Sequence, residues 1–321
     1  MKNIMIIGAG QLGSRHLQGV VQSKLPLKIL VVDPSFDSLE LAKSRANEIS
    51  FGNQTTLVEY QQAITSLTDI DICIIATTAN VRFKVFQELI AKCTVNNIIF
   101  EKVLFQKEEE YKAVEELLAN NKINAWVNCP RRVFPAYQNL QFLLVNESNI
   151  SMTVTGSNWG LACNSIHFID LFSFLSGNSD FELDCSLLED VVGSKRNGFY
   201  ETFGKLSGRD KNKNIFELCC SDDDEKVNIE VKIETSRFEV LIKETHGELI
   251  VTNKGIKTVE LYQPLYQSQL THLNVEEIVT LSTSSLTSFA DSKKIHLPFI
   301  RSIKQHIESS LNEQLDACPI T

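Results

Sequence analysis

Long apolar runs are missing from this sequence of 321 residues. No window approaches the roughly 18 apolar residues that a membrane-spanning helix needs. The first eight residues carry one lysine and only a few apolar side chains, which is less than a signal peptide requires. We therefore expect a cytoplasmic protein with no membrane partner.

An excess of positive charge is also missing. Lysine and arginine number 31 against 40 aspartates and glutamates, which gives a formal net charge of −9 and a pI near 5.3. An acidic chain repels nucleic acid and anionic membrane surfaces, so neither is an expected partner. Hydrophobic residues make up 43% of the chain, which is enough for the two domains that its length suggests.

The eight cysteines lack the spacing of a metal site. None forms a CxxC pair with a matching second pair or with nearby histidines, so we expect no metal. We interpret them as reduced thiols, most of which are buried as small hydrophobic side chains.

The first 125 residues alternate short β-branched runs with longer stretches of helical period. The expected strands are 2–7, 28–32, 56–58, 71–76, 97–100 and 123–128. The expected helices are 13–23, 38–49, 85–91 and 108–120. Strands separated by helices of this length imply βαβ crossovers. Continuous apolar strands imply a parallel sheet covered on both faces, so we predict a doubly wound α/β domain over residues 1–125.

The pattern changes in residues 126–321. Residues 151–156 and three runs between 227 and 252 alternate apolar with polar side chains, with a turn at His246-Gly247. Such runs predict an antiparallel sheet with one face available for packing. Helices are expected at 165–175 and 299–311, and the acidic cluster 222–225 is expected to be a solvated loop. We therefore predict a second, α+β domain with a large, mainly antiparallel sheet.

The stretch IMIIGAGQLGSRHL places Gly8, Gly10 and Gly13 in GxGxxG spacing between an expected strand and an expected helix. Gly8 permits the tight turn, Gly10 lets a pyrophosphate approach the backbone, and Gly13 allows close packing of helix on strand. The helix N-terminus then offers free N–H groups to the phosphates. We predict a Rossmann-type dinucleotide site whose turn also includes Ala9, Gln11 and Leu12.

Asp33 lies 20 residues after Gly13, at the end of the second expected strand. A carboxylate at this place accepts hydrogen bonds from the adenosine ribose and repels a 2′-phosphate, so we expect NAD rather than NADP. Two other interpretations remain. The glycines form a merely structural turn, or they form another nucleotide site, such as that of a methyltransferase that binds S-adenosylmethionine.

Five stretches have the order and spacing of one enzyme family. They are GAGQLGSRHL (8–17), ATTAN (76–80), IIFEKV (98–103), VNCPRR (127–132) and NSIHFIDLFSFLSG (164–177). Through them the chain resembles the Gfo/Idh/MocA oxidoreductases, named after glucose–fructose oxidoreductase and inositol dehydrogenase. The resemblance implies NAD(P)-dependent oxidation or reduction of a sugar, sugar nucleotide or polyol without a metal. It also implies a homodimer or homotetramer that associates through the open sheet of the second domain.

The same resemblance assigns residues at the ends of two strands. Lys102 matches the family's substrate-contacting lysine, where an ammonium polarises the reacting oxygen as hydride moves. Glu101 matches the glutamate near the nicotinamide ribose, while Val103 replaces the family's proline, which usually marks a cis or kinked peptide. Further cofactor contacts are expected in the ATTAN turn, from Thr77, Thr78 and Asn80.

The resemblance also implies a catalytic histidine. His167 matches it, and imidazole titrates in the range that suits proton exchange with a hydroxyl. Many members carry an aspartate one helical turn earlier, where this chain has Cys163 followed by Asn164, a further expected substrate contact. Since a thiol cannot stabilise imidazolium as a carboxylate does, a non-catalytic dinucleotide sensor or regulator stays an alternative to an enzyme. His167 as a core histidine is the plainer interpretation.

Asn128, Arg131 and Arg132 match a stretch that enters the family's substrate site. Two adjacent arginines favour an anionic substrate, such as an acidic or nucleotide-linked sugar. Internal salt bridges are the alternative. Trp159 either stacks on a sugar face or packs in the core.

Overall fold

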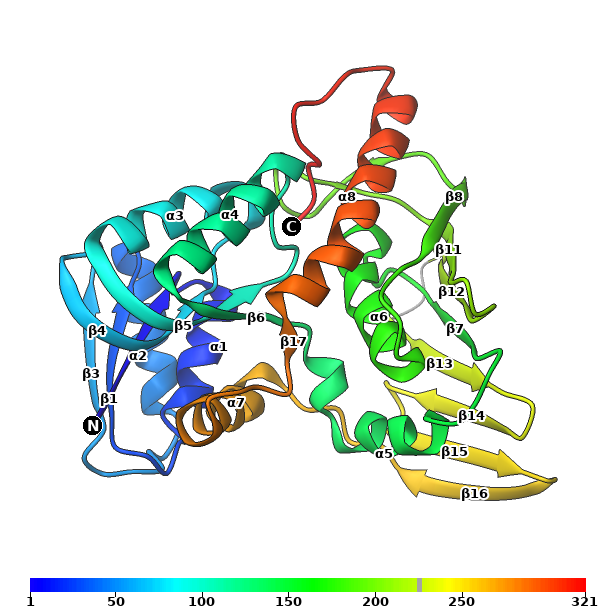
Figure 1. Cartoon of the computed structure of the whole chain (residues 1–321), viewed down its shortest axis with the longest axis horizontal. Coiled ribbons are helices and arrows are strands. Elements are labelled where there is room, and N and C mark those ends of the chain that lie inside the picture. Colours follow the sequence, from blue (N-terminus) through cyan, green and yellow to red (C-terminus); the bar gives the residue numbers. More distant parts are fainter. Residues whose placement is uncertain (224–226) are drawn as a thin grey trace. The chain divides into compact units, whose positions relative to one another are not determined.

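The computed structural model describes residues 1–223 and 227–321, so residues 224 and 225 of the acidic cluster 222–225 lie outside the described residues. The chain forms two compact units. The first contains residues 1–105, 109–130 and 265–290, and the second contains residues 106–108, 131–264 and 291–321 (Figure 1).

The first unit is built on a seven-stranded sheet in the order β17-β6-β5-β4-β1-β2-β3. Its strands are β1 (Lys2–Ile7), β2 (Leu27–Val32), β3 (Leu57–Gln61), β4 (Leu67–Ile75), β5 (Cys93–Glu101), β6 (Asn124–Asn128) and β17 (Thr287–Ser288). All pairs are parallel except β17 with β6. The sheet reverses direction of growth between β1 and β4, as the predicted doubly wound fold requires, and that prediction is confirmed.

Helices cover both faces of this sheet (Figure 1). They are α1 (Gln11–Val20), α2 (Phe36–Asn47), α3 (Ala79–Lys92), α4 (Glu108–Asn121) and α7 (Gln267–Leu281). The central strands are apolar along their length because both faces are buried: Ile4 to Ile7 of β1 are all at most 5% exposed. The sequence alone did not predict α7, which packs against α1 from far along the chain.

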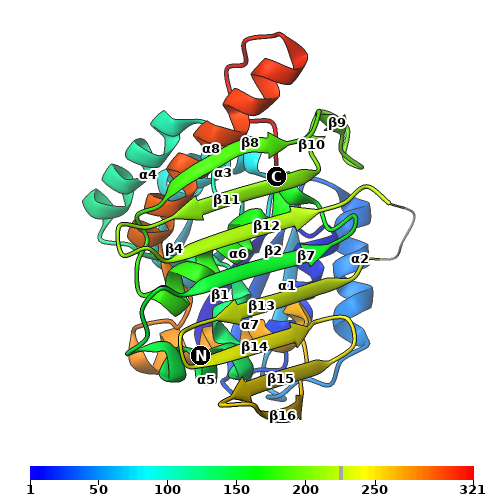
Figure 2. The same ribbon diagram turned by 90° about the vertical axis from the view of Figure 1, so that its right-hand side faces the viewer.

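The second unit contains an eight-stranded sheet in the order β16-β15-β14-β13-β7-β12-β11-β8, seen face-on in Figure 2. Its strands are β7 (Ser151–Gly156), β8 (Glu182–Leu188), β11 (Gly204–Arg209), β12 (Ile215–Cys220), β13 (Ile229–Glu234), β14 (Phe238–Lys243), β15 (Glu248–Asn253) and β16 (Ile256–Leu261). Only β7 and β12 pair in parallel. The predicted large, mainly antiparallel sheet is therefore confirmed.

The two faces of this sheet differ. Val231 and Ile233 of β13 are buried, whereas the alternating Lys232 is partly exposed and forms ion pairs with Glu234 and Glu239. The buried face packs against α6. The remaining elements of the unit are η1 (Pro130–Val133), α5 (Pro135–Leu144), α6 (Leu161–Ser176), β9 (Val192–Gly193), β10 (Tyr200–Glu201) and α8 (Phe289–Leu311), whose first residues belong to the first unit.

The expectation that most cysteines are buried, unpaired thiols is confirmed. All eight cysteines are free thiols, and six of them are buried.

Candidate functional site

The predicted site residues of the first unit gather at one edge of its sheet. Gly8 follows β1, Asp33 follows β2, Thr77 follows β4, and Glu101 and Asn128 end β5 and β6. Because these strands are parallel, their carboxyl ends lie at the same edge, where α/β sheets bind ligands. The sequence therefore identified one contiguous edge of the sheet.

The glycine-rich turn leaves open space at its centre. Gly8 has a φ of +95°, and a Cβ there would lie 2.9 Å from the Ala76 carbonyl oxygen. A Cβ on Gly13 would lie 1.8 Å from the Gly8 carbonyl oxygen, so both positions require glycine. A Cβ on Gly10 would meet no atom within 4 Å. Gly10 is also the N-cap of α1, so the unfilled space adjoins free helix N–H groups, as a phosphate site requires.

Asp33 connects the glycine turn to the next helix. Its Oδ2 accepts a hydrogen bond from Ala9 N at 2.7 Å, and its Oδ1 accepts one from Ser35 N at 2.8 Å. Ser35 is the N-cap of α2. A carboxylate has about four acceptor positions, so Asp33 can still accept from a pair of ribose hydroxyls.

The start of α1 is held by an arginine that the sequence analysis missed. Arg45 of α2 donates to the Gln11 carbonyl and side-chain oxygens at 3.1 and 2.6 Å, and to Ser14 Oγ at 2.6 Å. It lies 34 residues after Gln11, and no sequence motif marks it. Gln11 and Leu12 are themselves exposed at the beginning of the helix.

The ATTAN turn leads from β4 into α3. Thr78 is the N-cap residue of α3, and Asn80 is exposed in its first turn. The Thr77 hydroxyl oxygen is buried and has no hydrogen-bond partner among the described residues. An orphaned hydroxyl at the ligand-binding edge of the sheet fits a residue that hydrogen-bonds a cofactor.

Glu101 ends β5 inside a buried polar network. Its Oε1 lies 2.7 Å from His16 Nε2 and accepts from Asn128 Nδ2 at 2.5 Å. Asn128 Nδ2 also donates to Gln267 Oε1 at 2.8 Å, and His16 Nδ1 lies 3.0 Å from Thr271 Oγ1. The sequence analysis named Glu101 and Asn128, but it did not identify the two α7 residues.

Lys102 follows in a segment that a buried arginine holds. The Lys102–Val103 peptide is cis. Arg82 of α3 is 1% exposed and donates to the carbonyl oxygens of Thr77 and Val103, and to that of Leu104 at 2.8 Å. Burial lowers the pKa of Arg82 to about 10, an effect that the negative charge of Glu101 opposes.

In the second unit, α6 carries the remaining residues that the resemblance singled out. Cys163, Asn164 and His167 lie in its first two turns, and His167 is only partly buried. Both oxygens of Glu201 accept from the start of this helix, from Ala162 N at 2.8 Å and Cys163 N at 3.2 Å. Glu201 therefore places a carboxylate at the positive end of α6, which the sequence analysis did not anticipate.

The two predicted substrate arginines are both in internal ion pairs. Arg131 donates from Nε and a terminal nitrogen to the two oxygens of Glu244, and its guanidinium lies 4.0 Å from the Phe168 ring centroid. Arg132 Nε lies 3.0 Å from Asp170 Oδ2. The salt-bridge alternative thus describes both side chains in this structure, while their contact with an anionic substrate stays a prediction.

Trp159 is packed in the second unit. Its side chain is 5% exposed, its Nε1 donates to the Cys219 carbonyl oxygen at 2.9 Å, and its ring meets Phe168 edge-on. Asn164 Nδ2 donates to the Trp159 carbonyl oxygen at 2.7 Å. The packing alternative therefore describes this tryptophan.

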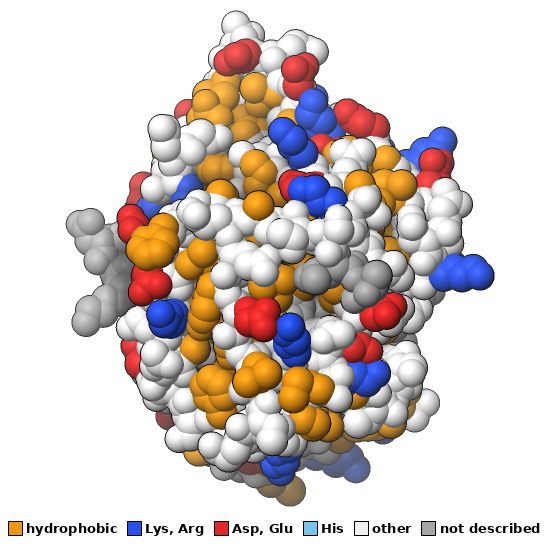
Figure 3. Space-filling view, turned by 90° about the vertical axis from the view of Figure 1, so that its left-hand side faces the viewer, with side chains coloured by type: hydrophobic (Ala, Val, Ile, Leu, Met, Phe, Trp, Pro, Cys, Tyr) orange, Lys and Arg blue, Asp and Glu red, His pale blue; other side chains and the backbone are white. Residues whose placement is uncertain are grey.

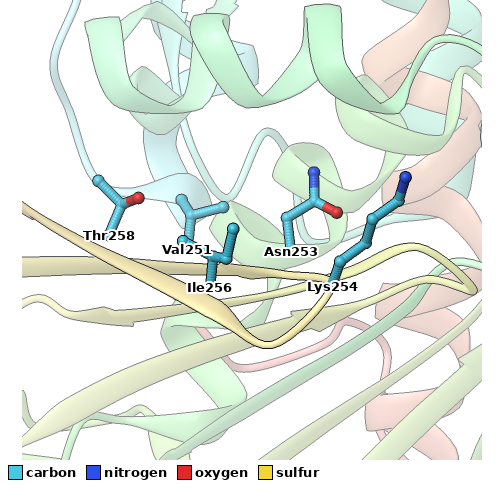
Figure 4. A pocket seen from close by; sticks show the side chains of 5 residues that line it. All are labelled: Val251, Asn253, Lys254, Ile256 and Thr258. Carbon is cyan, nitrogen blue, oxygen red and sulfur yellow. The ribbon is translucent and has the colours of Figure 1, made fainter.

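A separate depression of about 300 Å³ lies on the β15–β16 hairpin (Figure 4). The lining side chains all rise from the same side of the hairpin: Val251, Asn253, Lys254, Ile256 and Thr258. None of the predicted site residues lines it.

Two kinds of feature are absent from the described ranges, 1–223 and 227–321. These ranges contain no group of three or more His, Cys, Asp or Glu side chains that could hold a metal ion. They also contain no helix with the length and apolar character needed to cross a membrane.

On the face drawn in Figure 3, acidic and basic side chains are interspersed with small groups of hydrophobic ones.

Solved structures share this fold, whereas sequence comparisons found nothing. No protein-family model and no curated protein matches the sequence. UDP-N-acetylglucosamine 3-dehydrogenase GnnA from Acidithiobacillus ferrooxidans is 14% identical, with a TM-score of 0.72 over 97% of this chain and 99% of that chain. An oxidoreductase from Agrobacterium radiobacter, solved with NAD+, L-tartaric acid and magnesium, is 14% identical, with a TM-score of 0.74 over 95% and 96%.

A third neighbour has a different description. It is a super-repressor mutant of Gal80p from Saccharomyces cerevisiae, 11% identical, with a TM-score of 0.71 over 96% of each chain. At these identities the likeness shows the fold, and this chain has the fold of oxidoreductases such as GnnA along nearly its whole length.

Proposed function

We propose that this protein is an NAD-dependent oxidoreductase that moves a hydride between the nicotinamide and a hydroxyl or carbonyl group of a sugar, acidic sugar or sugar nucleotide. The observation that supports it best is the open space beside Gly10, at the N-terminus of α1 and next to Asp33. The neighbours described as dehydrogenases and as an NAD+ complex support the same reaction class.

The cofactor-binding residues of this proposal follow the edge of the first sheet. The turn from Gly8 to Gly13 would hold the pyrophosphate, and Asp33 the adenosine ribose. Residues nearer the nicotinamide would come from the ends of β4 and β5: Thr77, Thr78, Asn80, Glu101 and Lys102. We propose the dinucleotide-binding domain as residues 1–125 and the substrate-binding and oligomerisation domain as residues 126–321.

We propose Lys102 and His167 as the catalytic residues, as the family resemblance implies. The bound nicotinamide would supply the hydride acceptor or donor. The Lys102 ammonium would hydrogen-bond the reacting oxygen and stabilise its negative charge. The His167 imidazole would take the hydroxyl proton during oxidation and return it during reduction.

We propose fewer substrate-binding residues than the sequence suggested. Asn128 and Asn164 stay candidates for hydrogen bonds to sugar hydroxyls. Arg131, Arg132 and Trp159 each have an internal partner in the second unit, so they are weaker candidates for substrate contacts. A neutral sugar fits this reduced set as well as an acidic one.

The cofactor preference is tested by titrating the protein with NADH and NADPH and following their fluorescence. We expect tighter binding of NADH. Asp33→Asn keeps an oxygen that can accept from Ala9 N, so the turn should stay intact, but it removes the charge that repels a 2′-phosphate. The ratio of the two dissociation constants should therefore shift toward NADPH by about tenfold. An unchanged ratio would contradict the role of Asp33.

A second candidate is a dinucleotide-binding regulator without turnover. The Gal80p super-repressor structure and the Cys163 thiol one turn before His167 favour it. The two functions separate when the protein is incubated with NAD+ and a panel of sugars while the absorbance of reduced nicotinamide is followed. Turnover that Lys102→Ala abolishes supports the enzyme. Tight cofactor binding without turnover of any sugar supports the regulator.

We further propose a homodimer or homotetramer that associates through the face of the second sheet seen in Figure 2. This face carries polar and charged side chains, such as the ion pair of Lys205 with Glu217. Sedimentation equilibrium gives the stoichiometry. Lys232→Glu, which reverses a charge on the same face, should then weaken association.

A further inference from the structure

His16 is a buried titratable group that the proposed reaction does not use. It lies in α1, directly after the glycine-rich turn, and its side chain is 1% exposed. Its Nε2 lies 2.7 Å from Glu101 Oε1, and Glu101 is itself 3% exposed. A histidine in the first helix is therefore connected directly to the residue that precedes Lys102 at the end of β5.

The neighbours of His16 Nδ1 indicate which nitrogens carry hydrogen. The Thr271 hydroxyl can donate one hydrogen bond, and it does so along its helix to the Gln267 carbonyl oxygen at 3.1 Å. Thr271 Oγ1 therefore acts as an acceptor toward Gln267 Nε2 at 2.9 Å and toward His16 Nδ1 at 3.0 Å. The alternative donor to Nδ1 is Gln267 Nε2, which is farther away, at 3.4 Å.

The neighbours of Glu101 indicate that it is a carboxylate. Its Oε1 faces two nitrogens at once, His16 Nε2 and Asn128 Nδ2, at 2.7 and 2.5 Å. An ionised oxygen that accepts from two N–H groups satisfies both donors. The proton between His16 and Glu101 is then on the imidazole. Arg82 is a further positive charge that interacts with Glu101.

One oxygen of this network stays available. The buried Asn128 Oδ1 has no hydrogen-bond partner among the described residues. Glu101 and Asn128 are opposite each other in the β5–β6 register, at the carboxyl edge of the sheet. Asn128 Oδ1 therefore presents an acceptor, beside Glu101, to a ligand that carries hydroxyl or amide N–H groups.

We propose that His16 is a positioning residue, held as an imidazolium that donates from Nδ1 to Thr271 and from Nε2 to Glu101. By this contact it fixes the Glu101 carboxylate for the nicotinamide half of the cofactor. The cofactor part of this inference rests on the proposed function, whereas the protonation state of His16 does not. The glycine-rich turn and the Lys102 segment are thus joined through one buried ion pair.

The protonation state can be measured without any ligand, from the ¹⁵N chemical shifts of the imidazole nitrogens at neutral pH. His16→Gln assigns the signals among the six histidines. We expect both nitrogens of His16 to be protonated. A neutral ring, with either Nδ1 or Nε2 lacking its hydrogen, would overturn the proposal.

The positioning role is tested by a double-mutant cycle on NADH affinity. His16→Gln and Glu101→Gln should each weaken binding by about tenfold, and the double variant should be no weaker than either single one, because both remove the same contact. His272→Gln, in the same α7 helix as Thr271, is the matched control and should stay within about twofold of the wild type. Wild-type affinity in His16→Gln, or losses that multiply in the double variant, would contradict the coupling.

The two proposals fail in different ways. If the wild-type protein binds neither NADH nor NADPH, the proposed function fails, while the imidazole spectrum still decides the state of His16. If the wild type binds NADH and the cycle shows independent losses, the function stands and the positioning role fails. A His16→Gln variant that does not fold leaves the spectrum of the wild type as the deciding measurement, with signals assigned from variants of the other five histidines.

Discussion

Arg131 and Glu244 form a two-point ion pair inside the second unit, with Nε to Oε1 at 3.0 Å and a terminal nitrogen to Oε2 at 2.8 Å. The hydroxyls of Tyr137 and Tyr262 also donate to Oε1, at 3.0 and 3.2 Å. The carboxylate therefore accepts four hydrogen bonds from three side chains. This arginine, a substrate candidate with a salt bridge as the alternative in the sequence analysis, joins η1, α5 and the β-sheet.

Removing this guanidinium should destabilise the folded state, because Glu244 would be left as a buried charge without its counterion. We expect Arg131→Met to lower the free energy of unfolding by about 3–5 kcal/mol, measured by urea denaturation. Arg301 is a matched control, since it forms the same two-point contact with Glu108 but both side chains are about half exposed. Arg301→Met should cost less than about 1 kcal/mol. Equal losses of unfolding free energy in the two variants would contradict the importance of burial for the Arg131–Glu244 pair.

The same cluster should make the protein sensitive to acid. Burial alone would raise the pKa of Glu244, but Arg131 and the two tyrosines outweigh it and lower that pKa below its ordinary value of 4.5. The unfolded state then binds the proton more tightly than the folded state. The stabilisation is therefore complete above about pH 4.5 and is lost as the pH falls through the folded-state pKa.

Urea denaturation at several pH values checks this sign. The free energy of unfolding of the wild type should fall more steeply with acidification below pH 4.5 than that of Glu244→Gln, whose amide does not titrate. Parallel curves for the two proteins would show that Glu244 does not contribute to the acid sensitivity.

Arg82 should support the Lys102 segment in the first unit. It donates to three carbonyl oxygens, those of Thr77, Val103 and Leu104, in the interior. Arg82→Met should therefore cost about 3 kcal/mol of unfolding free energy, at roughly 1 kcal/mol for each acceptor left without its donor. Arg82→Lys should recover only part of this unfolding free energy, because one ammonium group cannot reach all the carbonyl oxygens that the planar guanidinium contacts. Lys84→Met, on the exposed side of the same helix, should change stability by less than about 0.5 kcal/mol.

The first sheet could be predicted because a local sequence pattern marks each of its main strands. Apolar runs such as residues 71–76 and the glycine-rich turn each identify a strand or a helix start without reference to the rest of the chain. Strands β8 and β11 were missed because they contain Asp184, Ser207 and Gly208, which weaken the alternation. Helix α7 was not predicted, and nothing in its sequence indicates that it packs against α1.

Site residues that belong to a sequence motif could be predicted. Residues that are connected only by contacts in the folded chain could not. Spacing alone located Gly10 and Asp33. The partner of His16 is 85 residues away and that of Arg131 is 113 residues away, so only the folded chain reveals them. The sequence could not show the ion pairs of the arginine doublet, because a guanidinium binds a protein carboxylate as readily as a ligand carboxylate.

The central claim is that the space beside Gly10 receives a dinucleotide phosphate, and Gly10→Ala tests it most directly. The added methyl group meets no protein atom within 4 Å, and the backbone of Gly10 has an ordinary φ of −64°, so the variant should fold normally. Gly193→Ala also adds a methyl group in open space, but in the second unit, and serves as its control. The measurement is the dissociation constant of NADH for the three proteins. The account predicts tight binding by the wild type and by Gly193→Ala, and binding at least about tenfold weaker by Gly10→Ala. Equal affinity of all three proteins, or no binding by the wild type, would contradict it.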